Sequence, residues 1–357
     1  MIPLFKPYMS PHVSKELDQI LHCGYIGQGK IVDNFELNLK NKLKCDFLIS
    51  TNSCTSALKI ALKLLPFKSG TILSTPLTCV ATTNSILLDG RFNLEWLDVD
   101  PNTCNIDLES LKDSVKRYNP VAVVLVHWGG YPNYLDEIKN IVGDIAIIED
   151  CAHAFGSYYK QKAIGSHGNY CAFSFGPIKH LTCGDGGALV LKNSKEEEDA
   201  KLYRWYGIDR NDRNNEKNFS LLGDKCNMND INACIGNSNL KCVDKIIRRH
   251  KENSKFYDNN LIDIDGISIM ERNADCESSC WLYTIKIENK DDFERAMRDR
   301  NIEVSLHHKR NDIYSFQNIK RYKILPKLNS FYNNLTNLPV GTWVMPEIVI
   351  DAIKKGW

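Results

Sequence analysis

Short apolar runs alternate with amphipathic segments between residues 46 and 195. The runs Val121-Ala-Val-Val-Leu-Val126 and Ile145-Ala-Ile-Ile-Glu149 are apolar almost throughout, which is typical of strands buried on both faces. The segment from Ser56 to Leu65 instead carries leucines along one side of a helix. This alternation predicts a largely parallel α/β sheet covered by helices. Catalytic groups are then expected at the carboxyl ends of the strands.

Residues 196–255 are richer in charged and polar side chains. They include most of the acidic run Lys195-Glu-Glu-Glu-Asp199 and the asparagine-rich run Asn211 to Asn218. Such patterning predicts a solvated helix and loop over most of the segment. The predicted boundary of this polar region is therefore near residue 255.

The last hundred residues return to a mixed pattern. The run Trp281-Leu-Tyr-Thr-Ile-Lys-Ile287 predicts a strand, and residues 292–301 predict a helix. A chain of 357 residues is longer than one compact domain usually is. We therefore expect a large domain over residues 1–240 and a smaller α+β domain over residues 241–357.

The composition of the chain limits which classes of partner and which cellular compartment are expected. The 45 basic and 44 acidic side chains leave a formal charge of +1, so no overall field favours nucleic acid or an acidic membrane. The 13 cysteines are scattered without the spacing of a disulfide framework or a zinc site. The first residues lack a leader pattern, and no apolar run is long enough to span a bilayer. We expect a cytoplasmic protein without a metal, nucleic-acid or membrane partner.

A single lysine marks the strongest chemical stretch, Cys171-Ala-Phe-Ser-Phe-Gly-Pro-Ile-Lys-His-Leu-Thr-Cys-Gly-Asp-Gly-Gly187. Lys179 lies there between an apolar strand and a glycine-rich turn whose small residues let the backbone approach a bulky ring. Partial burial lowers the pKa of a lysine amine and makes it able to form an imine with an aldehyde cofactor. Taken alone, this window fits a lysine at an ordinary loop better.

The stretch Ile147-Ile-Glu-Asp-Cys-Ala-His153 ends a predicted buried strand with two acids. A carboxylate at the end of a buried strand needs a partner, and a protonated pyridine nitrogen is one such partner. Asp150 is the candidate, because Glu149 is expected to point to the opposite face of the strand. His153 suits a hydrogen bond to a phenolic oxygen of such a cofactor, and a structural histidine is equally compatible with the sequence.

Hydroxyl side chains precede an amphipathic helix in Ser50-Thr-Asn-Ser-Cys-Thr-Ser-Ala57. The free N–H groups and positive dipole at a helix N-terminus suit a phosphate. An ordinary helix cap is the more common explanation of this window alone. Ser174 adds a hydroxyl that is able to reach the same phosphate.

Together these segments resemble the DegT/DnrJ/EryC1/StrS family of pyridoxal-phosphate (PLP) dependent sugar aminotransferases. The resemblance runs over nearly the whole chain, and its further segments are Gly24 to Gly29 with Phe35-Glu36, Pro76 to Thr82, His127 to Gly130, Tyr206 to Arg210 and Gly223 to Ala233. It implies the aspartate-aminotransferase-like fold (fold type I), with a large, mostly parallel mixed sheet and a smaller α+β C-terminal domain.

The resemblance also implies a role for each candidate residue. Lys179 would hold the cofactor, and Asp150 would face its ring nitrogen. Cofactor contacts would come from Thr55, Ser56, Cys79, His153 and Ser174, and from Lys225 acting on the neighbouring subunit of a homodimer. Substrate contacts would come from Gly27, Gln28, His307 and His308, the two histidines being the weaker candidates because paired histidines at a strand end are more often structural.

Three residues depart from the pattern of the family. Cys54 replaces a glycine in the phosphate turn, and Cys79 replaces an aromatic ring that stacks on the cofactor. His153 replaces a common glutamine. None of these changes removes the lysine chemistry.

The function implied is transfer of an amino group from glutamate to a nucleotide-linked keto-6-deoxyhexose, through PLP and its pyridoxamine 5'-phosphate form. The favoured position is C4 of a dTDP- or UDP-4-keto-6-deoxy sugar, for glycan or lipopolysaccharide-type sugar synthesis. A C3 aminotransferase, a PLP-dependent sugar dehydratase or another PLP enzyme remain alternatives, as does a catalytically silent binding protein. Related dehydratases carry histidine in place of the lysine, whereas here Lys179 is present and His180 follows it.

Overall fold

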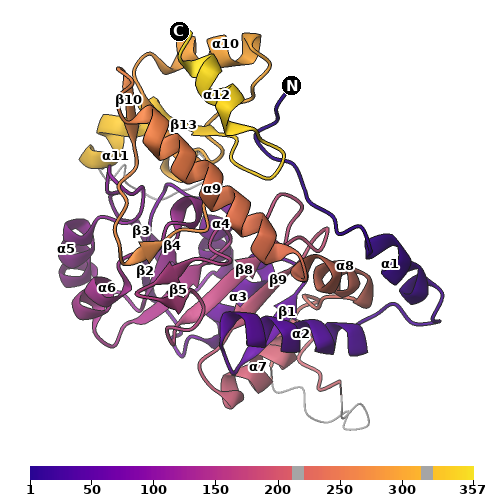
Figure 1. Ribbon diagram of the computed structural model, residues 1–357. Coiled ribbons are helices and arrows are strands. Elements are labelled where there is room, and N and C mark those ends of the chain that lie inside the picture. Colours follow the sequence, from indigo (N-terminus) through magenta and orange to yellow (C-terminus); the bar gives the residue numbers. More distant parts are fainter. Residues whose placement is uncertain (211–220, 315–324) are drawn as a thin grey trace.

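A seven-stranded sheet forms the centre of the molecule in the computed structural model (Figure 1). The structure describes residues 1–210, 221–314 and 325–357. The asparagine-rich run Asn211 to Asn218 therefore lies outside the described residues, and its predicted loop is left as a prediction.

The large sheet has the order β1-β9-β8-β5-β4-β2-β3. Every neighbouring pair is parallel except those made by β9, which runs antiparallel to β1 and to β8. Its strands are β1 Leu48–Thr51, β2 Gly70–Ser74, β3 Phe92–Trp96, β4 Ala122–Val126, β5 Ala146–Asp150, β8 Tyr170–Ser174 and β9 Gly187–Val190. The predicted mostly parallel mixed sheet is confirmed.

Helices cover both faces of this sheet. Alternate residues of β4 and β5 belong to two separate apolar clusters, because successive side chains of a strand point to opposite faces. One cluster includes side chains of α2 (Lys30–Leu43), α5 (Leu108–Tyr118), α6 (Leu135–Val142) and α8 (Asp230–Leu240). The other includes side chains of α3 (Cys54–Leu64), α4 (Val80–Asp89) and α7 (Ser194–Arg204).

A second, smaller sheet lies in the C-terminal part of the chain, beside the long helix α9 (Figure 1). Its antiparallel order is β10-β12-β13. The elements are α9 Val243–Leu261, β10 Ile267–Ile269, β12 Tyr283–Ile287, α10 Lys290–Asp299, α11 Pro326–Phe331, β13 Leu335–Leu338 and α12 Pro346–Ile353. The strand predicted over 281–287 and the helix predicted over 292–301 both occur, each displaced by two residues at its start.

A third sheet, β11-β6-β7, joins the two parts of the chain, because β11 (Cys276–Glu277) pairs with β6 (Tyr158–Tyr159), which pairs with β7 (Lys162–Ala163). The expected division at residues 240 and 241 falls between α8 and α9. Side chains of α9 contribute to the core of the large sheet and to that of the small sheet. The domain boundary therefore stays a prediction.

The expectation of a mostly solvated helix and loop over residues 196–255 is wrong for its second half. Helix α8 buries Ala233, Cys234 and Asn239, and α9 runs through residue 255 without a break. The asparagines of α8 are tolerated there because they satisfy loop carbonyls: Asn239 Nδ2 donates to Thr182 O at 2.8 Å, and Asn232 Nδ2 donates to Cys183 O at 2.8 Å.

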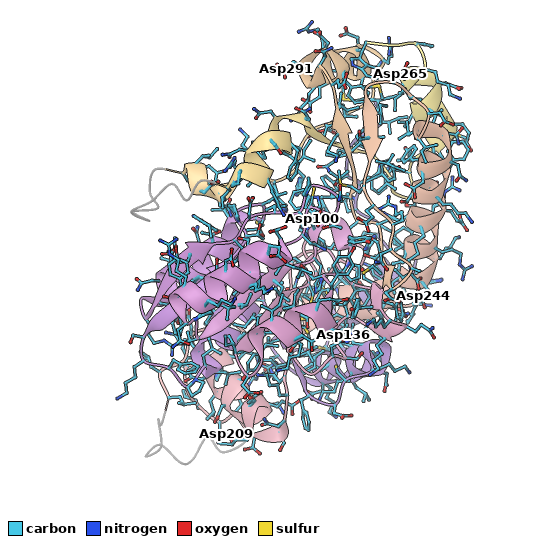
Figure 2. The ribbon with its side chains drawn as sticks, turned by 90° about the vertical axis from the view of Figure 1, so that its left-hand side faces the viewer. Asp100, Asp136, Asp209, Asp244, Asp265 and Asp291 are labelled. Carbon is cyan, nitrogen blue, oxygen red and sulfur yellow. The ribbon has the colours of Figure 1, made fainter. Side chains whose placement is uncertain are left out.

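Acidic side chains and free thiols occur in several parts of the molecule. The labelled aspartates of Figure 2 are spread over the whole length of the molecule and do not form one acidic patch. All 13 cysteines are free. Within the described part of the chain, every helix is too short or too polar to cross a bilayer.

One glycine fixes how the N-terminus of α3 meets the sheet. A Cβ at Gly187, the first residue of β9, would lie 2.5 Å from the backbone nitrogen of Cys54 and 2.5 Å from the carbonyl carbon of Ser53. Neither neighbour is a side chain that can turn away. The close approach of this helix end to the strands therefore requires glycine at this position.

Replacing Gly187 with alanine should thus lower the free energy of unfolding by about 1 to 3 kcal/mol, the usual cost of overpacking. The measurement is chemical denaturation of the two proteins side by side. The matched control is Gly176→Ala, whose Cβ would meet only Ser174 Oγ, at 3.6 Å. Equal stability of the Gly187→Ala protein and the parent would contradict the stated role of this close approach.

Candidate functional site

Lys179 lies in the loop that follows β8, and its amine is held close to an aromatic ring. Its Nζ is 3.7 Å from the centroid of the Trp281 indole. No hydrogen bond or ion pair to this nitrogen occurs among the described residues. Burial lowers the pKa of the Lys179 amine to about 8, and the nearby Asp150 carboxylate opposes this shift.

Asp150 is the last residue of β5, and neighbouring groups hold both of its carboxylate oxygens. Thr82 Oγ1 donates to Oδ2 at 2.6 Å, and the backbone N–H of Ala152 donates to Oδ1 at 3.1 Å. Cys54 Sγ lies 3.9 Å from Oδ1. Burial raises the pKa of Asp150, and the bonds from Thr82 and Ala152 oppose the shift. The structure brings this acid into electrostatic reach of Lys179.

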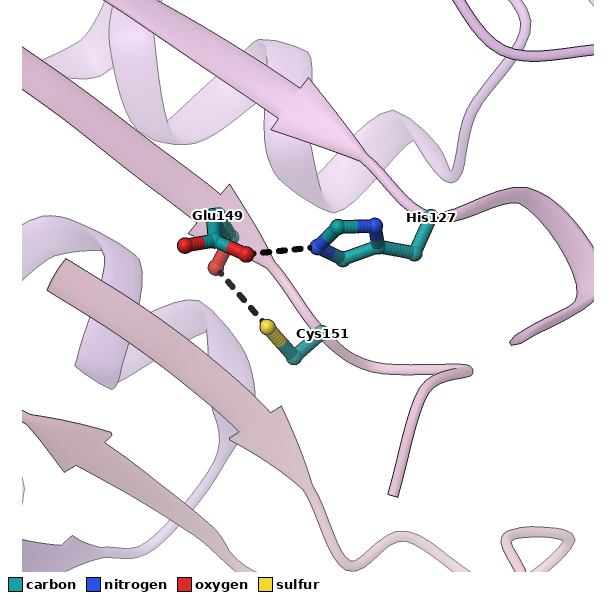
Figure 3. Close-up of side chains that lie close together, drawn as sticks. All are labelled: His127, Glu149 and Cys151. Carbon is teal, nitrogen blue, oxygen red and sulfur yellow. Dashed lines mark hydrogen bonds and ion pairs between the residues drawn. The ribbon is translucent and has the colours of Figure 1, made fainter. Parts of the chain in front are cut away.

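Glu149 points to the opposite face of β5, as the alternation of the strand predicts. Its Oε2 accepts a hydrogen bond from His127 Nε2 at 2.8 Å (Figure 3), and its Oε1 accepts one from Asn169 Nδ2 at 2.7 Å. The side chain of Glu149 is fully buried. Burial would raise its pKa, but the bonds to His127 and Asn169 hold the pKa below its ordinary value.

The buried group of His127, Glu149 and Cys151 has metal-ligand residue types within 4.8 Å of one another (Figure 3). The backbone N–H of Asn133 donates to His127 Nδ1 at 3.0 Å, so Nδ1 is an acceptor. The ring proton is therefore on Nε2, which donates a hydrogen bond to Glu149. Burial raises the pKa of Cys151 well above its ordinary value, which keeps the thiol protonated. Neither ring nitrogen of His127 has a lone pair to offer, so the group anchors β5 and does not form a metal site.

The hydroxyl cluster lies at the N-terminus of α3. Ser53 is the N-cap residue and accepts a hydrogen bond from the backbone N–H of Ser56 at 3.2 Å. Ser56 Oγ donates to Asn52 Oδ1 at 2.6 Å, whereas the hydroxyl of Thr55 has no partner among the described residues. Ser174 ends β8, directly opposite Gly187 of β9. The side chain of Cys54, the first residue of this helix, is in electrostatic reach of Lys179.

Lys225 lies next to the same helix end in its own chain. Its backbone carbonyl accepts a weak bond from Asn52 Nδ2 at 3.3 Å, and the carbonyl of Cys226 accepts one from Asn52 N at 2.7 Å. The side chain of Lys225 is exposed. The prediction that it acts on a neighbouring subunit remains a prediction.

His153 is buried against the ring that faces Lys179. It stacks on Trp281 with ring centroids 3.9 Å apart, and its Nε2 lies 3.2 Å from Nε2 of His308. Its Nδ1 is buried and has no partner in the described structure. Burial lowers the pKa of His153 well below its ordinary value, so the ring is neutral near pH 7. A neutral imidazole with one unused nitrogen remains able to bond an added group.

The two C-terminal histidines, weak candidates from sequence, join this cluster. The His307 and His308 rings are 4.2 Å apart, and His308 is parallel to His153 within 7°. Burial lowers the pKa of His307 to about 4 and that of His308 to about 2, with the positive charge of Lys179 as a further cause in both cases. Cys79 is half-buried at the N-cap of α4 and is also in electrostatic reach of Lys179.

Gly27 and Gln28 lie elsewhere in the chain. The Gly27 carbonyl accepts a bond from Asp230 N at 2.8 Å, and Arg210 Nη1 donates to Gln28 Oε1 at 2.8 Å. Among the described contacts, neither residue reaches the cluster around Lys179. Arg210 in turn lies over the ring of Trp205 at 4.9 Å. The predicted substrate role of this loop therefore stays a prediction.

Two residues of the site had not been assigned a role from sequence. Thr82 lay inside a segment of the resemblance, but its bond to Asp150 spans 68 residues. From sequence, Trp281 is only the first residue of a predicted strand. The one feature that marks it is an aromatic side chain at the edge of an apolar run. The ring is placed beside Lys179 by a hydrogen bond from its indole N–H to the carbonyl of Ile178, 103 residues earlier in the chain.

The cluster suits a cofactor with an aldehyde, a ring nitrogen and a phosphate. Lys179 offers the amine, Asp150 a buried carboxylate, and the first turn of α3 a hydroxyl and backbone N–H groups without partners inside the helix. The unused Nδ1 of His153 offers one further hydrogen bond. Such a set is able to bind the cofactor predicted from the sequence.

A model of the DegT/DnrJ/EryC1/StrS aminotransferase family matches residues 7–355. A UDP-4-amino-4,6-dideoxy-N-acetyl-beta-L-altrosamine transaminase of Campylobacter jejuni subsp. jejuni serotype O:23/36 is 32% identical over 349 residues, covering 92% of each chain.

Two solved structures share the complete fold. The AtS13 protein of Actinomadura melliaura has a TM-score of 0.96 at 41% identity, over 100% of this chain and 99% of that chain. The sugar aminotransferase CalS13 of Micromonospora echinospora has a TM-score of 0.96 at 36% identity, over 100% of both chains.

The Lys179 amine of the cofactor-free protein should titrate near pH 8, because burial disfavours its charged form. Only the neutral amine reacts with formaldehyde, so the rate of reductive methylation of Lys179 should rise through pH 8. Peptide mass spectrometry of timed samples gives this rate. Lys160 is the internal reference, since its hydrogen bond to Asp136 raises its pKa. A midpoint near 10.5 for Lys179 would contradict the proposed desolvation.

Proposed function

The chain belongs to the DegT/DnrJ/EryC1/StrS aminotransferase family, and from this premise we propose that it transfers the amino group of glutamate to a nucleotide-linked 4-keto-6-deoxyhexose. The family and its chemistry make it a PLP-dependent transaminase. The donor, the nucleotide and the carbon that receives the amine are parts of the proposal. The expected compartment is the cytoplasm, where free thiols stay reduced.

The observation that carries the proposal is the amine of Lys179. It lies in electrostatic reach of a buried carboxylate and of the first residue of α3. Burial brings its pKa to about 8, so a useful fraction is neutral and nucleophilic at physiological pH. A merely structural lysine has no need of this combination.

The residues around Lys179 have complementary tasks. Bound PLP supplies an aldehyde for the amine and a ring that accepts electrons from the substrate carbon. Asp150 holds a proton on the ring nitrogen, and the hydrogen bond from Thr82 Oγ1 keeps that carboxylate in place. Thr55, Ser56 and Ser174 bind the phosphate at the N-terminus of α3. His153 donates or accepts one bond through its unused Nδ1.

Lys179 also moves the proton of the reaction. Its neutral amine would act as general base toward the donor Cα, and its protonated form would act as general acid toward the sugar carbon. A pKa of about 8 suits both directions of this transfer.

The position of the amine is inferred from a relative. The Campylobacter protein bears the name of a UDP-4-amino-4,6-dideoxy sugar transaminase and shares 32% identity with this chain. This supports transfer to C4 of a UDP- or dTDP-linked 6-deoxy sugar. A C3 aminotransferase and a sugar dehydratase are the alternatives, and the presence of Lys179 favours transamination over dehydration.

A homodimer with shared active sites completes the proposal. Gly27 and Gln28 do not reach their own Lys179 in the described contacts, and the side chain of Lys225 projects from the surface. The exposed side chain of Lys225 is able to reach the site of a neighbouring subunit. We propose that Gly27 and Gln28 contact substrate and Lys225 contacts the cofactor phosphate across this interface.

A screen of nucleotide-linked 3-keto- and 4-keto-6-deoxy sugars with glutamate tests the function. We expect 2-oxoglutarate and an amino sugar, with the amine at C4, because Lys179 supplies both the anchor and the proton transfer. Mass spectrometry and NMR of the product give the amine position. An amine at C3, or loss of water without 2-oxoglutarate, would select one of the two alternatives.

The control pair for this screen is Lys179→Ala and Lys192→Ala. Both lysines lie over aromatic rings, Lys192 over Tyr170 at 4.1 Å. Turnover should fall by at least about a hundredfold in Lys179→Ala, along with the visible absorbance of the lysine-bound cofactor. Lys192→Ala should keep both. No turnover by the parent protein with any of these sugars would reject the proposed substrate class.

Mixed dimers test the shared site. Lys179→Ala and Lys225→Ala proteins should each have low activity, whereas unfolding and refolding them together should restore about a quarter of the parent activity, because half of the dimers then contain one intact site. Activity is compared with that of each variant refolded alone. An unchanged low activity, with mixed dimers demonstrated by differential tags, would show that both residues serve the same subunit.

A further inference from the structure

Trp281 is tied to the backbone beside Lys179. Its indole N–H donates to the carbonyl of Ile178, the residue before the lysine, at 3.0 Å. Only 2% of its surface is exposed. The face of the same ring lies 3.7 Å from Lys179 Nζ. The ring and the amine are thus held together by one short piece of backbone.

The backbone on either side of Trp281 is also fixed. Two hydrogen bonds fix Ser279 in place. Its backbone N–H donates to Ser157 Oγ at 3.0 Å, and its Oγ donates to His153 O at 3.1 Å. On the other side, Leu282 N donates to Gly129 O at 3.2 Å. Cys280 between them adopts a φ of 54°, a conformation that non-glycine residues keep only when their surroundings enforce it. Hydrogen bonds therefore hold the indole and the backbone on either side of it, whereas the described residues make no hydrogen bond to the Lys179 amine.

Ordinary core packing explains only part of this arrangement. Trp281 stacks with Phe5 at 5.1 Å and with His153 at 3.9 Å, as a buried aromatic residue should. Packing alone gives no reason for an ammonium group over the ring. That contact is a cation–π geometry, and tryptophan is the side chain that makes it best.

Among the described side chains of this cluster, Lys179 is the group that we expect to titrate near pH 8. Burial lowers the pKa values of His153, His307 and His308, so these rings are neutral there. Burial raises the pKa values of the Cys54 and Cys79 thiols. Asp150 attracts the ammonium form but makes no hydrogen bond to it. His180, next to Lys179 in the chain, also has its pKa lowered by burial.

We propose that Trp281 is a positioning residue for Lys179, holding the free and charged amine over its indole face and releasing it once the amine has lost its proton. This inference rests on the proposed function, in which the lysine nitrogen leaves the cofactor in each cycle and must return. A quadrupole attracts the ammonium ion and has much less hold on the neutral amine. The ring therefore keeps a waiting lysine beside the site without blocking its return.

The test uses cofactor-free protein and the methylation rate of Lys179 as a function of pH. Trp281→Leu removes the ring face, so the charged amine loses a stabilising contact and its midpoint should fall by about 0.5 to 1.5 pH units. Trp281→Phe should shift it by less.

A subtler variant covers the case in which Trp281→Leu does not fold. Tetrafluorotryptophan inserted at position 281 keeps the shape and the N–H but weakens the negative potential of the ring face, and it should also lower the midpoint. Trp128→Phe is the matched control, because Trp128 is equally buried and bonds Thr284 Oγ1 at 3.0 Å. Its midpoint should equal that of the parent.

An unchanged midpoint in the folded fluorinated protein would overturn the positioning role of Trp281. That result would leave the transaminase proposal intact, since the latter fails on a different observation, the persistence of the visible absorbance band in Lys179→Ala. A shift in Trp128→Phe as large as that at position 281 would also overturn it, because the effect would then come from general loosening of the core.

Discussion

The site depends on keeping one amine poorly solvated and yet free to move. A lysine on the surface is protonated and hydrated, and a lysine in a tight ion pair is immobile. Lys179 avoids both conditions: its nearest partner is the indole of Trp281, and Asp150 acts on it through space without a hydrogen bond. The surrounding residues therefore adjust the proton affinity of the amine while leaving its nitrogen unbonded, as a group that is both nucleophile and proton carrier requires.

The strand β5 supplies the fixed reference for this arrangement. Its last two residues are acids on opposite faces, and each acid has separate partners. Glu149 is locked by His127 and Asn169 in the core of one face. A buried carboxylate with its imidazole is costly to desolvate and adds little net stability. The bonds of Glu149 fix the end of β5. Asp150, the next residue, is thereby held on the opposite face of the strand, next to Thr82.

Features coded locally could be predicted from the sequence, and features coded by distant partners could not. The apolar runs of β4 and β5 and the leucines of α3 each specify an element without help from the rest of the chain. The polar helix α8 was missed because its asparagines look solvated until the carbonyls of Thr182 and Cys183 are placed beside them. The ring of Trp281 was missed for the same reason, because its position depends on a carbonyl 103 residues away. The predicted strand-end residues Asp150 and Ser174 lie where parallel-sheet topology puts them, and their roles remain proposals.

The unusual cysteine at the start of α3 illustrates how a close-packed site accommodates a side chain. The family glycine at the position of Cys54 suggests that no side chain fits there. The crowded position is instead Gly187 on the facing strand, where a Cβ would collide with the backbone of Ser53 and Cys54. The side chain of Cys54 points inward instead, with Sγ 3.5 Å from the carbonyl of Ala172 and 3.9 Å from Asp150. A protonated thiol is a weak donor to both oxygens, and burial raises its pKa well above the ordinary value. Cys54 therefore adds a polar neighbour to Asp150 without a charge, and the helix end keeps its close approach because Gly187 provides the space.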